Sequence, residues 1–315
     1  MQPDFPMEYP PFAPRQRLTP EAVIGLVALV CAAVLVITAV LCIPYYNRDS
    51  DPEVLVQEHR EEQQSAEELA SVEPWEPEET VETTAPPEAN PYTKRDFQYG
   101  RGNFLLCTQQ DSYPGVDVSA FQGEIDWQRV KASGIRFAMV RLGYRGYGKA
   151  GNMVVDEYAL KNLQGAAKAG LAVGAYFFSQ ATSIEEVDDE IFFFMKVLRD
   201  FELTMPIVLD WEYISDTART ANVDARTLTD CLKHFCEVMV EFGYEPMIYF
   251  NWSMARNHLY LSELEDYPFW LALYQDRMTF PYRVEMWQYT CTGRVPGIQG
   301  DVDINVFMPD PRKQK

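Results

Sequence analysis

Residues 171–212 read LAVGAYFFSQATSIEEVDDEIFFFMKVLRDFELTMPIVLDWE, with an apolar run at each end of an amphipathic segment. The runs at 171–178 and 206–212 have the length and composition of buried strands. Between them, Ser183 followed three residues later by Glu186 predicts the start of a helix that continues to about residue 199. This strand–helix–strand order predicts a parallel sheet covered by helices.

The same alternation continues on both sides of this stretch, from about residue 113 onward. Further strands are predicted at residues 115–119, 136–142, 246–251, 269–274, 284–289 and 302–307, which makes eight in all. Further helices are predicted at residues 126–133, 155–169 and 227–242. Because the helices fall among the first five strands, we expect an α/β fold, a TIM-like barrel whose last three strands pair directly. A doubly wound open sheet is the alternative.

A long apolar segment lies near the N-terminus. Residues 22–43, AVIGLVALVCAAVLVITAVLCI, contain no charged side chain. As a helix they would extend about 33 Å, enough to cross a bilayer core. A cleaved signal peptide is the alternative, but its apolar region is only about 7–15 residues long and ends in small residues. Arg15 and Arg17 precede the segment, so we expect a cytoplasmic N-terminus and a single-pass membrane protein with its catalytic part outside the cell.

Residues 49–90 carry fourteen acidic side chains and one basic side chain, together with many prolines. Such a segment has too little apolar surface to fold, which predicts a disordered spacer; an acidic binding tail is the alternative. The expected division is a cytoplasmic tail at 1–20, a transmembrane helix at 21–44, an acidic linker at 45–109 and the barrel at 110–311.

The composition excludes several function classes. A net charge of −20 and no basic stripe argue against nucleic-acid binding. Three histidines leave no His-rich metal cluster and little material for a nucleophilic triad. We therefore expect carboxylates to carry any catalysis, with no metal and no cofactor. Outside the apolar segment, Cys107, Cys231, Cys236 and Cys291 could form two disulfides or remain free thiols.

Four acids are candidates for that chemistry. Asp210 and Glu212 end an apolar strand two residues apart, so both point to one face with Cα atoms about 6.6 Å apart. Two carboxylates this close raise the pKa of at least one of them, which can keep a general acid protonated near neutral pH. Asp117 and Asp303 lie in the first and last strands, which are neighbours in a closed barrel. All four are predicted to meet at one end of the barrel.

Aromatic side chains gather near the same strand ends. Flat rings beside carboxylates suit the C–H faces of sugars, and core packing is the alternative for each. These residues are Tyr176, Trp211, Tyr249, Trp252, Tyr274, Trp287 and Tyr289.

Six segments, in order and spacing, resemble the family 25 glycoside hydrolases, the Chalaropsis-type lysozymes. They are GVDVSAFQGEIDW, VRLGYRGYG, VGAYFFSQA, VLDWE, WLALY and MWQYTCTGRVPGIQGDVDINVF, and the match extends over about residues 113–308. The resemblance implies a flattened (β/α)5(β)3 barrel. It also implies hydrolysis of the β-1,4 bond between N-acetylmuramic acid and N-acetylglucosamine in peptidoglycan. The apolar segment 22–43 would hold such an enzyme at the membrane.

The resemblance also implies roles for individual residues. Glu212 matches the general acid, and Asp210 matches the acid that stabilises charge at the anomeric carbon or orients the substrate's 2-acetamido group. Asp117 and Asp303 match acids of the sugar subsite. Four aromatic residues match substrate-binding positions, namely Tyr176, Tyr249, Tyr274 and Trp287. The chain departs from the family pattern at Phe121 and Phe177, where Trp and His are frequent.

The stereochemical course stays open at this stage. Carboxyl groups about 5–5.5 Å apart suit a retaining nucleophile and about 6.5–9.5 Å an inverting water, while attack by the acetamido group escapes that rule. We favour the acetamido route because the Asp-x-Glu strand end resembles chitinases that use it. Two functions remain as alternatives: a catalytically silent peptidoglycan-binding module, and a hydrolase of another N-acetylated glycan such as chitin.

Overall fold

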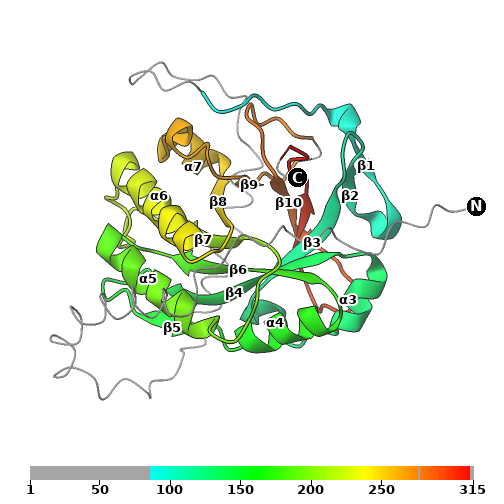
Figure 1. Ribbon diagram of the computed structural model, residues 1–315, viewed down its shortest axis with the longest axis horizontal. Helices are drawn as coiled ribbons and strands as arrows, with labels where there is room; N and C mark the ends of the chain where they lie inside the picture. Colours follow the sequence, from blue (N-terminus) through cyan, green and yellow to red (C-terminus); the bar gives the residue numbers. More distant parts are fainter. Residues whose placement is uncertain (1–85, 276, 313–315) are drawn as a thin grey trace, which may run out of the picture. The chain divides into compact units, whose positions relative to one another are not determined.

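The computed structural model describes residues 86–275 and 277–312, which form a closed barrel of strands with helices on its outside (Figure 1). Each barrel strand lies within a few residues of a predicted one, so the expectation of eight strands is confirmed. The strands are β3 (Tyr113–Val118), β4 (Phe137–Arg145), β6 (Ala172–Ser179), β7 (Ile207–Trp211), β8 (Pro246–Asn251), β9 (Phe269–Ala272), β10 (Met286–Gly293) and β11 (Val302–Phe307).

The pairing of the strands closes the sheet on itself. Their order is β3-β11-β10-β9-β8-β7-β6-β4, and β3 also pairs with β4, so the open-sheet alternative is excluded. All neighbours around the ring are parallel except β11, which runs antiparallel to both β10 and β3. The beginning of β11 therefore lies at the same end of the barrel as the carboxyl ends of the other seven strands.

One α-helix follows each of the first five barrel strands, and no α-helix separates the last three in the part of the chain that the structure describes. This order confirms the (β/α)5(β)3 expectation. The helix after β8 was not predicted from the sequence, because it is too short to show an apolar period. The five helices are α3 (Trp127–Ser133), α4 (Ala159–Lys168), α5 (Ile184–Val197), α6 (Ala225–Glu241) and α7 (Trp252–Asn257).

Side-chain caps fix where four of these helices begin. Asp126, Ser183, Asp224 and Asn251 each accept the backbone N–H three residues further on, at the starts of α3, α5, α6 and α7. The carboxylate of Glu186 accepts the N–H of Thr182 at 2.7 Å, not that of Ser183 as the predicted capping box requires. The helix start predicted at Ser183 is confirmed, and the glutamate has another role that is described below.

One predicted helix begins later than expected. Residues 153–155 form the short strand β5 (Met153–Val155), which pairs antiparallel with the end of β4. This pairing uses Val155, the first residue of the predicted helix, and α4 begins only at Ala159.

The folded part also begins earlier than residue 110, which corrects the linker expected over 45–109. The hairpin of β1 (Phe97–Tyr99) and β2 (Leu105–Cys107) packs on the barrel, with Tyr92 and Phe104 buried. The N–H of Leu105 donates to the Tyr289 hydroxyl at 3.2 Å. The rest of that linker, the predicted transmembrane helix and the predicted cytoplasmic tail lie outside the described residues.

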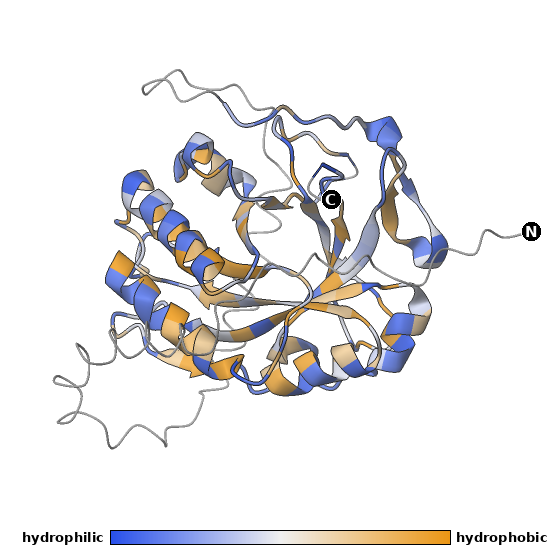
Figure 2. Cartoon of the chain, viewed as in Figure 1, coloured by the Kyte–Doolittle hydropathy of each residue, from blue (hydrophilic) through white to orange (hydrophobic). Residues whose placement is uncertain are grey.

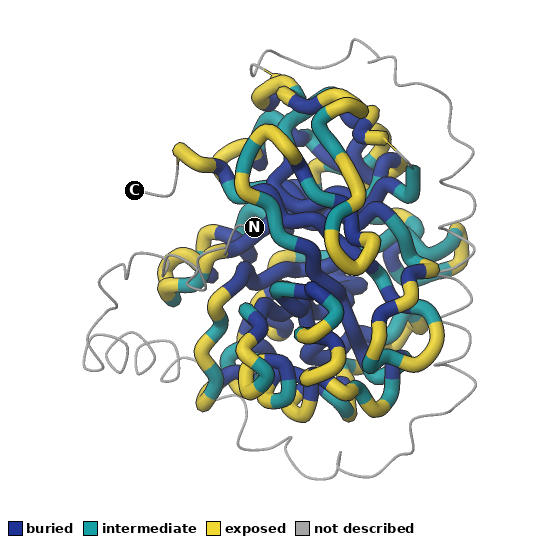
Figure 3. The backbone as a smooth tube through the Cα atoms, turned by 90° about the vertical axis from the view of Figure 1, so that its right-hand side faces the viewer, coloured by how far each residue is buried: buried dark blue, intermediate teal, exposed yellow. Residues whose placement is uncertain are grey.

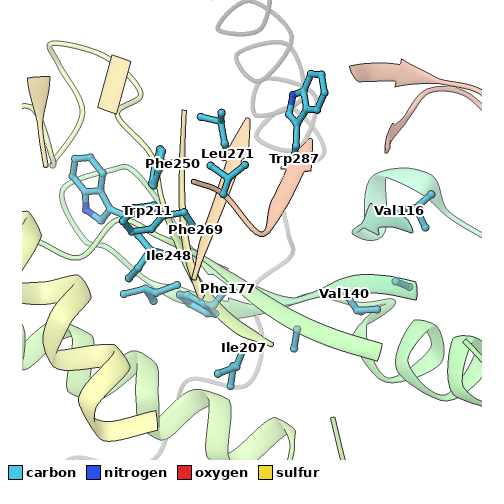
Figure 4. Close-up of a cluster of buried hydrophobic side chains, with 14 of the residues drawn as sticks. Val116, Val140, Phe177, Ile207, Trp211, Ile248, Phe250, Phe269, Leu271 and Trp287 are labelled. Carbon is cyan, nitrogen blue, oxygen red and sulfur yellow. The ribbon is translucent and has the colours of Figure 1, made fainter. Parts of the chain in front are cut away.

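The buried side chains form two layers. One lies between the strands and the helices and includes Phe177, Trp211 and Trp287 (Figure 4). The other, here called the inner cluster, contains no helix residue, so it fills the inside of the barrel. Its members are Phe137, Met139, Tyr176, Met205, Val208, Met247, Tyr249, Trp270, Ala272, Met286 and Phe307.

The surface follows the pattern expected of helices packed on a barrel. Much of the helices' surface is hydrophilic (Figure 2), although Leu160, Ile184, Phe192 and Val240 are exposed. The buried chain gathers at the centre while exposed turns lie outside (Figure 3). Among the described residues, no helix is both long and apolar enough to cross a membrane. Cys107, Cys231, Cys236 and Cys291 are all free thiols.

Phe104→Ala tests the corrected N-terminal boundary. Phe104 is 2% exposed, so its truncation leaves a cavity and should lower the free energy of unfolding by about 3–5 kcal/mol. Tyr99→Ala in the same hairpin is the control, because Tyr99 is 59% exposed. Urea denaturation of both variants makes the comparison, and equal stability would show that the hairpin does not belong to the folded unit.

Candidate active site

The alternation of side chains along the strands points three of the four acids to the inside of the barrel. Side chains two residues apart in a strand share a face, so Asp210 points inward with Val208 of the inner cluster. Asp303 shares its face with Phe307 in β11, and it lies directly opposite Asp117 of β3. Because directly opposite residues of paired strands point to the same side, Asp117 also faces inward. Asp117 and Asp210 are buried.

Glu212 follows the last residue of β7 directly and is partly exposed. Its negative charge acts electrostatically on Tyr249, an inner-cluster residue. Burial raises the pKa of Tyr249 well above its ordinary value, and the negative charges of Glu212, Asp210 and Asp117 raise it further. Tyr249 is thus a neutral phenol at physiological pH, with three of the four acids close enough to act on it electrostatically.

The fourth acid acts on a second tyrosine. Burial raises the pKa of Tyr274 well above its ordinary value, with Asp303 as the next contributor and Glu212 and Asp117 adding to it. Tyr274 follows β9, on the face that packs against the inner cluster. The two tyrosines therefore lie within electrostatic reach of the four predicted acids, each tyrosine being influenced by three of them.

A glutamine connects the tyrosines to one of these acids. Gln288 of β10 donates from Nε2 to Oδ2 of Asp117 at 3.0 Å. Its Oε1 accepts the Tyr274 hydroxyl at 2.7 Å and, at the longer distance of 3.5 Å, the Tyr249 hydroxyl. Both polar ends of the buried amide are thus in use, which fixes its orientation and that of the Asp117 carboxylate.

Asn305 of β11 holds the same carboxylate from the other side. Its Nδ2 donates to Oδ2 of Asp117 at 2.6 Å, while its Oδ1 accepts the indole N–H of Trp270 at 2.8 Å. Sequence reasoning did not single out Gln288 or Asn305. Their spacing of two residues from Met286 and Phe307 marks both as inward-facing polar side chains only once the structure shows which face of each strand lies inside.

The four predicted sugar-binding aromatics divide between the two faces of the sheet. Tyr176 belongs to the inner cluster, with its ring edge-on to Trp270 at 6.3 Å between centroids. Tyr249 and Tyr274 also lie inside. Trp287 does not: it points into the outer layer, is fully buried, and donates its indole N–H to the Leu273 carbonyl at 2.8 Å. The structure therefore does not bring Trp287 to this site, and we leave it out of the proposed sugar-binding set.

A buried ion pair supports the loop after β3. Arg141 of β4 donates to Asp156 at 3.0 Å, and both side chains are almost fully buried. Asp156 also accepts the N–H of Ala120 at 2.9 Å, and the Arg141 guanidinium lies 4.9 Å from the centre of the Phe121 ring. Phe121, one of the two departures from the family pattern, thus contacts a buried cation next to the strand that carries Asp117.

A second ion pair anchors the loop between β7 and α6. Arg219 of this loop donates to both oxygens of Glu186, at 2.5 Å and 2.9 Å. Burial opposes ionisation of Glu186, but hydrogen bonds from Arg219 and Thr182 outweigh it and lower the pKa to about 2. The glutamate of the predicted capping box is therefore an ionised anchor for the loop that follows Glu212.

This arrangement is equipped for proton transfer. It combines carboxylates with phenols that stay protonated, and one acid, Glu212, lies at the end of a strand where it is partly exposed. Among the described residues, no group of His, Cys, Asp and Glu side chains is arranged to hold a metal ion.

Comparison with known proteins identifies the family. The model of "Glycosyl hydrolases family 25" matches residues 116–298, more than half of the chain. The chain belongs to this family. It is therefore a glycoside hydrolase, and the matched segment contains Asp117, Asp210 and Glu212 but ends before Asp303.

The chain is also similar to individual proteins. The protein YegX of Escherichia coli (strain K12) is 30% identical over 203 residues, covering 61% of this chain and 68% of that protein. Lysozyme M1 of Streptomyces globisporus is 28% identical over 203 residues, covering 61% of this chain and 67% of that protein. The modular autolysin LytC of Streptococcus pneumoniae has the same fold, with a TM-score of 0.57 at 23% identity over 67% of this chain. The matched part of the present protein covers 50% of the LytC chain.

Gln288→Met tests the polar network of the family 25 barrel. The substitution keeps the length of the side chain but removes the donor to Asp117 and the acceptor for Tyr274. We expect the free energy of unfolding to fall by about 1–3 kcal/mol, the cost of losing one partner of buried hydrogen bonds. Gln98→Met on the exposed side of β1 is the matched control. Urea denaturation that shows the same stability for both variants would mean that the network contributes nothing.

Proposed function

We propose that this protein is a muramidase that hydrolyses the β-1,4 bond between N-acetylmuramic acid and N-acetylglucosamine in peptidoglycan. The observation that carries the proposal is the Asp-x-Glu end of β7 beside two further acids and two protonated tyrosines inside a family 25 barrel. The similarity to a relative named as a lysozyme supports it.

In this proposal, the four acids divide the work according to their surroundings. Glu212 is partly exposed and follows the strand, so it is placed to protonate the leaving glycosidic oxygen. Asp210 is buried two residues earlier, where its charge stabilises the positive anomeric carbon or orients the 2-acetamido group. Asp117 is held by two amides and, with Asp303, lines the sugar subsite. Tyr176, Tyr249 and Tyr274 contact the sugar.

We propose that the reaction proceeds with retention through the substrate's own acetamido group. The acetamido oxygen attacks the anomeric carbon while the glycosidic C–O bond breaks and Glu212 gives its proton to the leaving oxygen. Water then adds to the anomeric carbon, Glu212 takes back a proton from that water, and the acetamido group is released. The fixed position of Asp117 leaves Asp210 as the acid that steadies the acetamido group.

Glu212→Gln tests the assigned general acid. Because the amide cannot donate an acidic proton, release of soluble fragments from purified cell walls should fall by at least about 10²–10⁴-fold while the melting temperature is kept. Asp210→Asn should cost about 10²–10³-fold through lost charge stabilisation. Full activity of Glu212→Gln would remove it from the acid role.

Mass spectrometry of the products identifies the bond. Digestion should leave N-acetylmuramic acid at each new reducing end, whereas N-acetylglucosamine there would contradict a muramidase. Chitin, tested in parallel, should not be cleaved. Binding to insoluble peptidoglycan without any new reducing end would instead indicate a catalytically silent binding module.

We also propose that residues 22–43 anchor the enzyme in the cell membrane, with the acidic segment 49–85 as a spacer between the membrane and the barrel. The proposal rests on the uncharged apolar run and on Arg15 and Arg17 before it. The full chain should sediment with membranes and resist extraction by alkaline carbonate, and a chain without residues 22–43 should be released. Equal release of both would contradict the anchor.

A further inference from the structure

The main chain at Glu212 lies beyond the sheet that precedes it. The register of β6 and β7 ends with Ser179 opposite Trp211, so the Glu212 carbonyl has no place in the ladder. The side chain of Gln180, the residue after β6, takes over at this point. Its Nε2 donates to the Glu212 carbonyl at 2.7 Å and to the Ser179 carbonyl at 3.0 Å. The Gln180 side-chain amide thus gives the Glu212 carbonyl the hydrogen bond that a backbone N–H would give if β6 were longer.

The two strand ends are tied in both directions. The indole N–H of Trp211 donates to the Ala181 carbonyl at 2.8 Å, across the same pair of strands. Gln180 and Trp211 are both buried, so neither hydrogen bond can be exchanged for one with water. Trp211, directly before Glu212, is therefore held by its own indole N–H. The carbonyl of Glu212 is held by the Gln180 side chain.

The orientation of the Gln180 amide is set by the loop that follows Glu212. Its Oε1 accepts the hydroxyl of Thr220 at 3.1 Å, and both side chains are fully buried. With Oε1 occupied in this way, Nε2 must face the two carbonyls. The adjacent Arg219 donates to the main-chain carbonyl of Gln180 and, through its ion pair with Glu186, fixes the loop to α5.

We propose that Gln180 is a positioning residue for catalysis. It holds the main chain of Glu212, and through it the direction of the carboxyl group that hands over the proton. This inference rests on the proposed function of Glu212 as the general acid. No role for Gln180 follows from the family resemblance of its segment, VGAYFFSQA, since its effect depends on a carbonyl 32 residues away in the chain.

Gln180→Glu is the sharpest test, because it keeps the shape of the side chain and places a carboxylate oxygen against two carbonyls. Two substrates separate positioning from folding. Cell-wall glycan has a sugar leaving group that must be protonated, whereas an aryl β-glycoside of the wall disaccharide with an acidic phenol does not need the acid. We expect kcat on wall glycan to fall about 10–100-fold with KM changed less than about twofold. For the aryl glycoside, kcat/KM for phenol release reports only the bond-cleavage step, in which no general acid is needed, and it should change less than about threefold. Lowering the pH should restore part of the loss, because the introduced carboxyl group, once protonated, can donate one hydrogen bond again.

A second pair of variants covers the case in which Gln180→Glu does not fold. Thr220→Val removes the hydroxyl that orients the amide and should show the same selective loss, only smaller. Thr229→Val is the matched control: Thr229 is also fully buried and hydrogen-bonded, to the N–H of Tyr260 at 3.0 Å, but it lies in α6. Its kcat on both substrates should match that of the wild type when melting temperatures are compared.

The outcomes distinguish this inference from the proposed function. If Gln180→Glu and Thr220→Val lose activity equally on both substrates, in proportion to the fall in their melting temperatures, Gln180 is only structural and the inference is overturned. It is also overturned if Glu212→Gln shows the selective loss and the Gln180 and Thr220 variants do not. If Glu212→Gln keeps full activity on wall glycan, the acid assignment itself fails, and the positioning role fails with it.

Discussion

The antiparallel insertion of β11 between β3 and β10 is the constraint on which the rest of this structure depends. It closes the ring that would otherwise be an open sheet, and it reverses one strand so that its beginning lies at the carboxyl ends of the others. This reversal places Asp303 opposite Asp117, and it turns Asn305 toward the same carboxylate. A parallel last strand would have presented its other end at this side of the barrel.

The inside of the barrel changes from apolar to polar along its length. Phe137 and Phe307 pack edge to face in the inner cluster, with centroids 6.0 Å apart. Toward the carboxyl ends of the strands, buried carboxylates take their place, and buried polar groups need hydrogen-bond partners. Gln288 and Asn305 supply these partners for Asp117. A network in which each amide is used at both ends is rigid, which suits a site that must hold charges in fixed positions before substrate arrives.

Glu212 differs from the other three acids because it lies after its strand. Exposure is what a proton donor to a bound glycan requires, but a residue outside the sheet loses the support of the backbone ladder. The structure replaces that support with hydrogen bonds from three side chains, those of Gln180, Trp211 and Arg219. In the proposed mechanism, this gives Glu212 access to substrate without giving up a fixed geometry.

The sequence by itself determined the local features. Eight strands follow from short apolar runs and four of the five helices from a period of 3.6 residues, and these features depend only on near neighbours. It did not determine which face of β10 is inside, because a strand buried on both sides shows no alternation, so Trp287 and Gln288 could not be told apart. Only the tertiary structure decided how residues 86–109 pack. It also decided the hydrogen bonds that Asp117 receives from Gln288 and Asn305, which are 171 and 188 positions away in the chain. Such partners become neighbours only when the barrel closes, and no pattern within one segment records that closure.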